Sequence, residues 1–310
     1  MGENASGRLA VAAVCVLLFG QGIASSATAE EGRVTGHFIE ISDTFTIHYE
    51  TAGRGDITIV FIPGWTMTTR AFQHQLAHFA GSDDFTALTY DPRGQGLSTK
   101  TTEGHYYEQH GRDLHALIEA LGLDRIVLAG WSYGTLDQLA YVDQFGAEKL
   151  VGLIMIDGTP KSKGTDFTKE WVWWGTKDEG DQDDFFKYFS YDLLLDRQSV
   201  NKGFAEWMLE DASPENVAFV LEMTSHTSDA VAALLNTAGW FDDYSAALIA
   251  LDGRIPLLYV VREEWRDLAT QWASRTTPSA EVVAFGKHMM FWERPEEFNA
   301  VLDRYLEGLR

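Results

Sequence analysis

The segment GWSYG at residues 130–134 places Ser132 between two glycines in the pattern G-x-S-x-G. The apolar run IVLA (126–129) comes directly before it, and the helix-like segment TLDQLAYVDQFG (135–146) comes directly after it. Where a strand turns sharply into a helix through this pattern, the serine hydroxyl is lifted above the edge of the sheet. A serine hydroxyl is a weak nucleophile until a base takes its proton. The pattern therefore predicts nucleophilic chemistry at Ser132, with a histidine and a carboxylate further along the chain.

The histidine best placed to act as that base is His288, in the segment GKHMMFWERP (286–295). This segment follows the last apolar run of the chain, EVVAF (281–285). A histidine in the loop after the final strand can reach across the carboxyl end of a sheet, where ligands bind, to a nucleophile several strands away. His226 is the competing histidine after Ser132, but it falls in a segment without strand-like runs. We therefore expect His288 to be the base.

A second turn at the end of a strand offers backbone donors. The apolar run ITIVFI (57–62) ends in PGWT (63–66). A glycine in that place lets a backbone N–H point into the crevice where open sheets bind ligands. The N–H groups of Trp65 and Tyr133 are therefore predicted to form an oxyanion hole, which stabilises the charge on a carbonyl oxygen under attack. The segment DPRGQGLS (91–98), after the next apolar run, is expected to be a rigid internal turn with a scaffold role.

Strand-like and helix-like runs alternate along most of the chain, which is typical of a sheet covered by helices. HFIEIS (37–42) and TFTIHYET (44–51) predict an opening hairpin, and the later strand-like runs are short and apolar, as strands buried on both sides are. We predict an α/β fold with a mostly parallel eight-stranded sheet, helices on both faces and a helical lid inserted after the sixth strand. Residues 30–160 and 253–310 are assigned to the core, and the aromatic-rich residues 161–252 to the lid.

The chain has 310 residues, 45% of them hydrophobic, which is enough for one α/β domain with an insertion. At the N-terminus Arg8 precedes an apolar run (9–19), and small residues at 27–29 occupy the positions that a signal peptidase reads. We therefore predict a signal peptide at residues 1–29 with cleavage near Ala29, and a secreted or periplasmic protein without a stable membrane anchor. The single cysteine, Cys15, lies in this segment, so no disulfide is expected after cleavage.

The formal net charge of −22 bears on the partners of the protein. A surface of this sign repels nucleic acid and anionic lipid, so we expect neither as a partner. His74 and His78 are four residues apart, as in a zinc-binding pair, but Gln75 stands where the H-E-x-x-H motif has a glutamate. We expect no metal and no cofactor.

In this combination the motifs resemble those of the α/β-hydrolase fold superfamily. The resemblance covers roughly residues 36–310 and is weakest in the predicted lid. It implies Ser132 as nucleophile, His288 as base, and Trp65 and Tyr133 as donors to the oxyanion. The motifs that carry it follow one another in the expected order: PGW (63–65), DPRGQGLS (91–98), GWSYG (130–134) and HMMFWERPEEFN (288–299).

The resemblance leaves the position of the triad acid open. Many relatives carry an aspartate after the seventh strand, in a Gly-x-x-Asp turn, where this chain has VREEW (261–265). Others carry the acid after the sixth strand, where Asp157 stands in this chain. We favour Asp157, with Glu264 and then Glu263 as the alternatives.

With a serine as nucleophile, the resemblance implies a serine esterase or lactonase that works through an acyl-enzyme. Relatives that act on haloalkanes or epoxides carry an aspartate in the place of Ser132. The aromatic lid favours a small uncharged or apolar ester or lactone as substrate. Two alternatives remain open: a hydrolase-like ligand-binding or signalling protein with slow or no turnover, and a cofactor-free perhydrolase or acyltransferase that uses the same residues.

Overall fold

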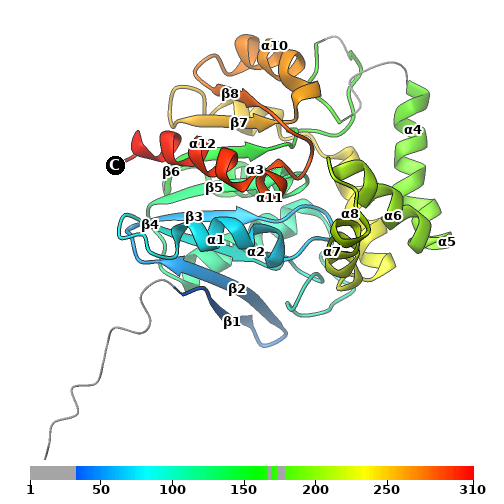
Figure 1. Cartoon of the computed structure of the whole chain (residues 1–310), viewed down its shortest axis with the longest axis horizontal. Coiled ribbons are helices and arrows are strands. Elements are labelled where there is room, and N and C mark those ends of the chain that lie inside the picture. The colour runs from blue at the N-terminus through cyan, green and yellow to red at the C-terminus, as the bar shows by residue number, and fades with distance from the viewer. Residues whose placement is uncertain (1–32, 167–168, 174–178) are drawn as a thin grey trace, which may run out of the picture. The chain divides into compact units, whose positions relative to one another are not determined.

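The computed structural model describes residues 33–166, 169–173 and 179–310. The predicted signal peptide at residues 1–29 lies outside the described residues. Eight described strands form one sheet (Figure 1). The strands are β1 Thr35–Ser42, β2 Phe45–Gly53, β3 Ile57–Ile62, β4 Phe85–Tyr90, β5 Ile126–Trp131, β6 Leu150–Ile156, β7 Leu257–Val261 and β8 Glu281–Ala284.

The order of the strands places a ligand crevice in the middle of the sheet. The order is β1-β2-β4-β3-β5-β6-β7-β8. The hairpin β1-β2 and the pair β2-β4 are antiparallel, and every pair from β4 to β8 is parallel. The chain passes from β3 to β4 on one side and returns past β3 to β5 on the other. Because the direction of winding reverses between β3 and β5, the carboxyl ends of these two strands flank the place where open sheets bind ligands.

Helices cover both faces of the sheet, as the sequence predicts. Crossovers between parallel strands are right-handed, so the reversal at β3 puts α1 on one face and α2 and α3 on the other. In agreement, α1 contacts α11 and α12, whereas α2 contacts α3. Figure 1 shows α1, α11 and α12 in front of the strands. These core helices are α1 Gln73–Phe79, α2 Tyr107–Ala120, α3 Gly134–Phe145, α10 Arg266–Thr276, α11 Met290–Glu293 and α12 Pro295–Glu307.

The described residues between β6 and β7 form a helical insertion, as predicted. Its ends lie together, because Tyr244 N donates to Pro160 O at 2.9 Å and Lys161 forms an isolated bridge with Asp243. Figure 1 shows its helices grouped beyond the carboxyl ends of the parallel strands. The insertion contains α4 Glu179–Lys187, a π-helix Tyr188–Asp192, α5 Leu193–Leu195, α6 Arg197–Met208, α7 Pro214–Ser225, α8 Asp229–Phe241 and α9 Ser245–Ile249.

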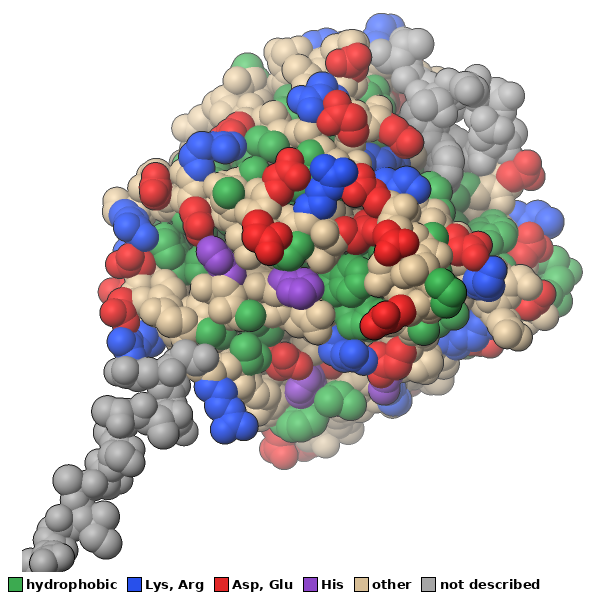
Figure 2. All heavy atoms as spheres, viewed as in Figure 1, with side chains coloured by type: hydrophobic (Ala, Val, Ile, Leu, Met, Phe, Trp, Pro, Cys, Tyr) green, Lys and Arg blue, Asp and Glu red, His purple; other side chains and the backbone are tan. Residues whose placement is uncertain are grey.

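Local sequence signals explain where the longer helices of the insertion begin. Asp196, Ser213 and Ser228 precede α6, α7 and α8, and each side chain accepts a hydrogen bond from the backbone N–H three residues later. Such N-caps satisfy donors that have no partner inside the helix. The burial of the strands depends on their place in the sheet. Every residue of β3, β5 and β7 is buried, whereas every residue of the edge strand β1 is exposed or half-buried. On the face shown in Figure 2, acidic side chains are spread widely among the Lys and Arg side chains.

Candidate active site

Ser132 lies at the sharp turn between β5 and α3, with a backbone φ of 56°. The turn is fixed from both sides, because Ser132 N donates to Ile156 O at 2.9 Å and Thr135 N donates to Ser132 O at 3.0 Å. The helix starts so close to the neighbouring strand that a Cβ at Gly134 would lie 2.4 Å from Ile62 O. Only glycine fits there, which is the physical reason for the second glycine of the G-x-S-x-G pattern.

Backbone strain concentrates around the crevice. Among the described residues the non-glycine positions with positive φ are Thr66 (62°), Ser132 (56°) and Asp157 (40°). They follow β3, β5 and β6, which lie side by side with their carboxyl ends at one edge. Such conformations persist only where surrounding contacts enforce them, and they cluster at functional sites. The strained positions therefore mark the same edge of the sheet as the sequence motifs.

The His288 side chain is hydrogen-bonded to Asp157, which directly follows β6. The distance from His288 Nδ1 to Asp157 Oδ2 is 2.5 Å, and both side chains are fully buried. The loop that carries the histidine is held by Trp131, whose Nε1 donates to His288 O at 2.9 Å. The second ring nitrogen, His288 Nε2, is buried and has no hydrogen-bond partner among the residues that the structure describes. His288 and Ser132 line the same cavity.

The other two carboxylates considered for the acid lie in solvent. The Glu264 side chain is 79% exposed, and its Oε2 lies 3.9 Å from Arg262 Nε. Glu263 is 58% exposed and pairs with Arg266 at 2.7 Å. Of the three candidates, Asp157 is the one that contacts His288.

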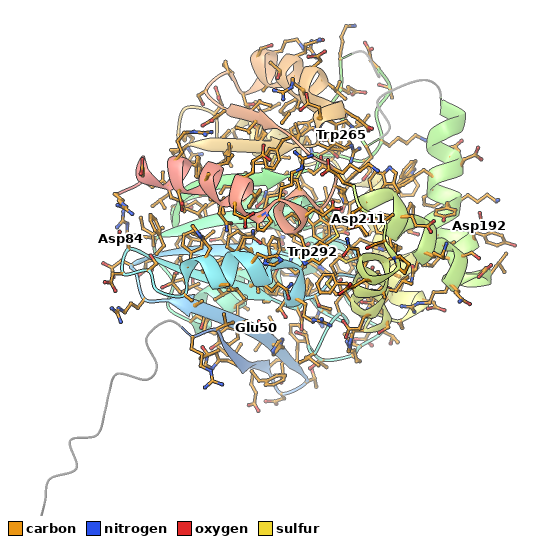
Figure 3. The ribbon with its side chains drawn as sticks, in the orientation of Figure 1. Glu50, Asp84, Asp192, Asp211, Trp265 and Trp292 are labelled. Atoms are coloured by element: carbon orange, nitrogen blue, oxygen red, sulfur yellow. The ribbon has the colours of Figure 1, made fainter. Side chains whose placement is uncertain are left out.

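Arg262, which the sequence interpretation missed, completes the buried cluster. Its backbone N donates to Asp157 Oδ1 and its Nη1 to Asp157 Oδ2, both at 2.8 Å. The residue is 6% exposed, and its guanidinium lies 3.6 Å from the centroid of the Trp265 ring. Figure 3 labels Trp265 near the helical insertion, just beyond β7. An arginine directly after the wholly apolar strand run at 257–261 was the one signal available for it.

The protonation states follow from burial and from these contacts. Burial by itself would raise the pKa of Asp157, but the charge of Arg262 and the hydrogen bond from His288 outweigh it and hold that pKa below its ordinary value. Burial lowers the pKa of His288 below the ordinary value, against the opposing contribution of Asp157, and Arg262 lowers it further. At neutral pH the carboxylate is therefore ionised and the imidazole is neutral.

The two predicted oxyanion donors lie beside Ser132. A Cβ at Gly64 would be 2.8 Å from Ser132 Cβ, so the turn that carries Trp65 approaches the serine closely. Within the described part of the chain, neither Trp65 N nor Tyr133 N donates to a protein acceptor. The side chain of Trp65 is anchored to the helical insertion, since its Nε1 donates to Ala232 O at 2.7 Å. Both backbone N–H groups are thus available to a ligand oxygen.

The cavity above Ser132 is apolar and walled largely by the helical insertion. It is open to solvent on one side, and the space within it, with the solvent at its mouth included, amounts to about 310 Å³. Besides Ser132 and His288, its lining includes the polar Asn236 on α8. Asn236 Nδ2 donates to Ser190 Oγ at 2.8 Å, and its Oδ1 accepts from the Tyr133 hydroxyl at 3.3 Å. The aromatic residues of the wall are Trp65, Tyr133, Trp173, Phe185, Phe189, Phe204 and Trp207.

The remaining sequence candidates lie apart from this cavity. Asp91 accepts from Thr69 N and Leu97 N, each at 2.8 Å, and forms the internal turn expected of DPRGQGLS. His226 is bonded to Glu222 at 3.1 Å and is absent from the lining of the cavity around Ser132. His78 is bonded to Asp303 at 2.9 Å.

Neither a metal site nor a membrane span is found in the described part of the chain. No group of three or more His, Cys, Asp or Glu side chains there is arranged to hold a metal ion. None of the described helices combines the length and the hydrophobicity that crossing a membrane requires.

Known proteins share both the sequence pattern and the fold. An AB hydrolase superfamily protein of Bacillus subtilis is 25% identical over 275 residues, which cover 87% of this chain and 98% of that protein. A bromoperoxidase structure from Bacillus anthracis has a TM-score of 0.76 at 22% identity and covers 88% of this chain and 100% of that one. An esterase structure from Exiguobacterium antarcticum has a TM-score of 0.75 at 21% identity, with the same coverage of 88% and 100%. At these identities the two structures show a shared fold.

The chain also matches a whole protein family. The sequence pattern of the Alpha/beta hydrolase family matches residues 59–301, a range that includes Ser132, Asp157 and His288. This match extends over more than half of the chain and over the strands that carry the site. The protein belongs to the alpha/beta hydrolase family.

Proposed function

We propose that this protein is a serine hydrolase that cleaves a carboxylic ester or a lactone through an acyl-enzyme. Ser132 is the nucleophile, His288 the base and Asp157 the acid of the triad, and the N–H groups of Trp65 and Tyr133 receive the oxyanion. One observation carries the proposal: His288 Nδ1 is hydrogen-bonded to Asp157, while His288 Nε2, which has no partner within the described part of the chain, belongs to a ring that lines the cavity of Ser132. This is the arrangement that a serine nucleophile requires.

The reaction follows from these roles. Ser132 Oγ attacks the carbonyl carbon of the substrate, and His288 Nε2 takes the hydroxyl proton. The carbonyl oxygen becomes an oxyanion at the two N–H groups, where fixed dipoles stabilise it without reorganisation. The bond to the leaving alcohol then breaks as His288 returns the proton to the alcohol oxygen. Water repeats the sequence on the acyl-enzyme, which releases the acid and restores Ser132.

The walls of the cavity support an uncharged substrate. A charged acyl group would lose its hydration against aromatic rings without gaining an ionic partner, and that loss is costly. Phe189, Phe204 and Trp207 come from the segment between β6 and β7, which supports the proposal that residues 161–252 act as a lid over Ser132. The substrate class proposed is therefore a small apolar or aromatic ester or lactone.

Labelling with a fluorophosphonate tests the nucleophile directly. The wild-type chain is expected to react at Ser132 and to hydrolyse a short p-nitrophenyl ester with sustained turnover. Ser132→Ala is expected to lose about 10⁶ in kcat while it keeps its circular dichroism spectrum. Ser225→Ala is the matched control, because Ser225 lies on α7 and its hydroxyl only donates to Glu222 O. Ligand binding without labelling or turnover would instead support a non-enzymatic member of the family.

We also propose that the protein is exported, on the basis of the apolar run at 9–19 and the small residues at 27–29. The test is N-terminal sequencing of the protein from the periplasm or the culture medium of its host. A mature N-terminus near Glu30 is the expected result. A cytoplasmic protein that retains Met1 would contradict the proposal.

A further inference from the structure

Three donors hold the Asp157 carboxylate, and two of them come from one residue. Arg262 N donates to Oδ1 at 2.8 Å, and Arg262 Nη1 donates to Oδ2 at 2.8 Å. His288 Nδ1 donates to the same Oδ2 at 2.5 Å. The position of Arg262 follows from the sheet, since β7 pairs with β6 in parallel and Ile156 lies opposite Val260. The residues just after these two strands therefore meet at the same edge.

Tryptophan rings surround both Arg262 and His288. The guanidinium lies 3.6 Å from the centroid of the Trp265 ring, 5.0 Å from that of Trp207 and 5.8 Å from that of Trp173. The rings of Trp207 and Trp173 lie 4.9 and 5.4 Å from the His288 ring. A guanidinium stacks on aromatic faces and keeps its charge when buried. The same rings thus enclose the cation and the imidazole.

We propose, on the basis of the function proposed above, that Arg262 is a positioning residue of the active site. It holds the Asp157 carboxylate in the orientation that His288 needs, and its charge opposes protonation of the imidazole. It acts through Asp157 and does not touch the substrate. It extends the pH range of the enzyme downward.

The charge of the buried cluster depends on whether His288 carries a second ring proton. With His288 neutral, the opposite charges of Asp157 and Arg262 balance, and a proton on His288 would leave the buried cluster with a net positive charge. Burial therefore disfavours that proton, and Arg262 adds repulsion, which is the direction of the lowered pKa of His288. The charged groups that act on His288 are Asp157 and Arg262, and those that act on Asp157 are Arg262 and His288.

The other charged groups near the cluster have partners or lie in water. Glu264, on the short helical turn after β7, approaches Arg262 Nε at 3.9 Å but is 79% exposed, so solvent screens it. Glu263 pairs with Arg266. Lys287, next to His288 in the loop after β8, donates to Leu209 O at 3.0 Å. Removal of the charge at Arg262 should therefore change the electrostatic environment of His288 without compensation by these side chains.

The test separates the charge of Arg262 from its hydrogen bonds. Arg262→Gln keeps an amide donor and removes the charge. Arg262→Lys keeps the charge and removes the planar set of N–H donors that the guanidinium presents. Arg266→Gln is the matched control, a half-exposed arginine that pairs with Glu263 and does not contact Asp157. For each protein the rate of fluorophosphonate labelling is measured against pH, and thermal unfolding is recorded in parallel.

The expected outcome differs among the variants. For each protein the labelling rate at low pH is divided by its plateau rate at high pH. At pH values below both midpoints this ratio is expected to be about tenfold lower in Arg262→Gln than in wild type, since loss of a neighbouring charge shifts a pKa by about one unit or more. In Arg262→Lys the midpoint stays near that of wild type while the plateau falls. Arg266→Gln leaves both unchanged. An unchanged midpoint in Arg262→Gln would overturn the proposal, and so would a midpoint in Arg262→Lys raised as far as that of Arg262→Gln.

If Arg262→Gln does not fold, nuclear magnetic resonance of the His288 ring in wild type and in Arg262→Lys decides. The proposal requires that His288 become protonated only below the ordinary midpoint of 6.5 in both proteins. Protonation at or above that pH in either protein would contradict it. The failure of the underlying function looks different, because wild-type Ser132 would then show no labelling at any pH.

Discussion

The imidazole of His288 and the carboxylate of Asp157 meet at 2.5 Å although 131 residues separate them in the chain. They meet because β6 and β8 are separated only by β7 and all three strands run parallel, so their carboxyl ends share one edge of the sheet. The helical insertion accounts for most of the intervening chain and returns to the core near the point where it leaves. The proposed triad therefore depends on the order of the strands and tolerates a long insertion.

His288→Ala is expected to lower kcat nearly as far as the loss of the serine, because without a base the Ser132 hydroxyl stays protonated at neutral pH. Steady-state hydrolysis of a p-nitrophenyl ester gives the value. His226→Ala is the matched control, since His226 is bonded to Glu222 and does not line the Ser132 cavity. A severe loss in His226→Ala together with an active His288→Ala would place the base elsewhere.

Asp157→Asn is expected to lower kcat by about 10⁴, because an amide in that place favours the wrong tautomer of the histidine. Glu264→Gln should leave kcat near wild type, since the Glu264 side chain is 79% exposed and does not contact His288. Both values come from the same ester assay, with thermal unfolding to show that the variants fold. Loss of activity in Glu264→Gln but not in Asp157→Asn would move the acid to the residues after β7.

The pH dependence of kcat/KM on an uncharged ester follows from the direction of the His288 pKa. Burial sets this pKa below the ordinary histidine value of 6.5. A base with a lowered pKa stays unprotonated, and therefore active, at a pH where an ordinary histidine has lost half of its base form. Activity is thus expected to be largely retained at pH 6.5 and to fall at lower pH, as the pH passes through the pKa of His288. An acid midpoint at or above that value would contradict the account.

Phe204→Ala is expected to enlarge the cavity and to shift preference toward bulkier esters. Phe204 lines the cavity and packs edge-on against Trp65, with ring centroids 5.5 Å apart. The ratio of kcat/KM for a bulky ester to that for an acetate should rise about tenfold, within the range that small changes of an apolar pocket produce. Phe241→Ala serves as the control, because Phe241 is 70% exposed on α8. An unchanged ratio in Phe204→Ala would argue against the cavity as the acyl site.

Much of this architecture was readable from the sequence, because the strands at the centre of the sheet are apolar throughout and short. ITIVFI predicts β3, Ile57–Ile62, with its bounds unchanged, and Pro295 predicts the start of α12. The apolar run IPLLYVV (255–261) predicts a strand that starts at Ile255, but β7 begins at Leu257. Proline has no N–H to donate to a neighbouring strand, so Pro256 delays the strand.

The burial of Arg262 among the rings of Trp173, Trp207 and Trp265 could not be predicted from the sequence. An arginine after a strand is ordinarily a surface residue. Its burial here depends on Asp157 and Trp207, which are distant in the chain, as well as on the nearby Trp265. Asn236 was missed for a similar reason. Its place in the cavity wall is set by the packing of α8 on the core, which no local pattern encodes.

Detection of a covalent acyl group on Ser132 is the most direct test of whether this serine is the nucleophile. The protein is mixed with a p-nitrophenyl ester, quenched in acid within the first turnovers, and analysed by intact mass spectrometry and peptide mapping. The expected result is one acyl group per chain, located on Ser132, and a deacylation rate consistent with turnover. Steady hydrolysis with no acyl group on Ser132, or with the acyl group on another residue, would contradict it.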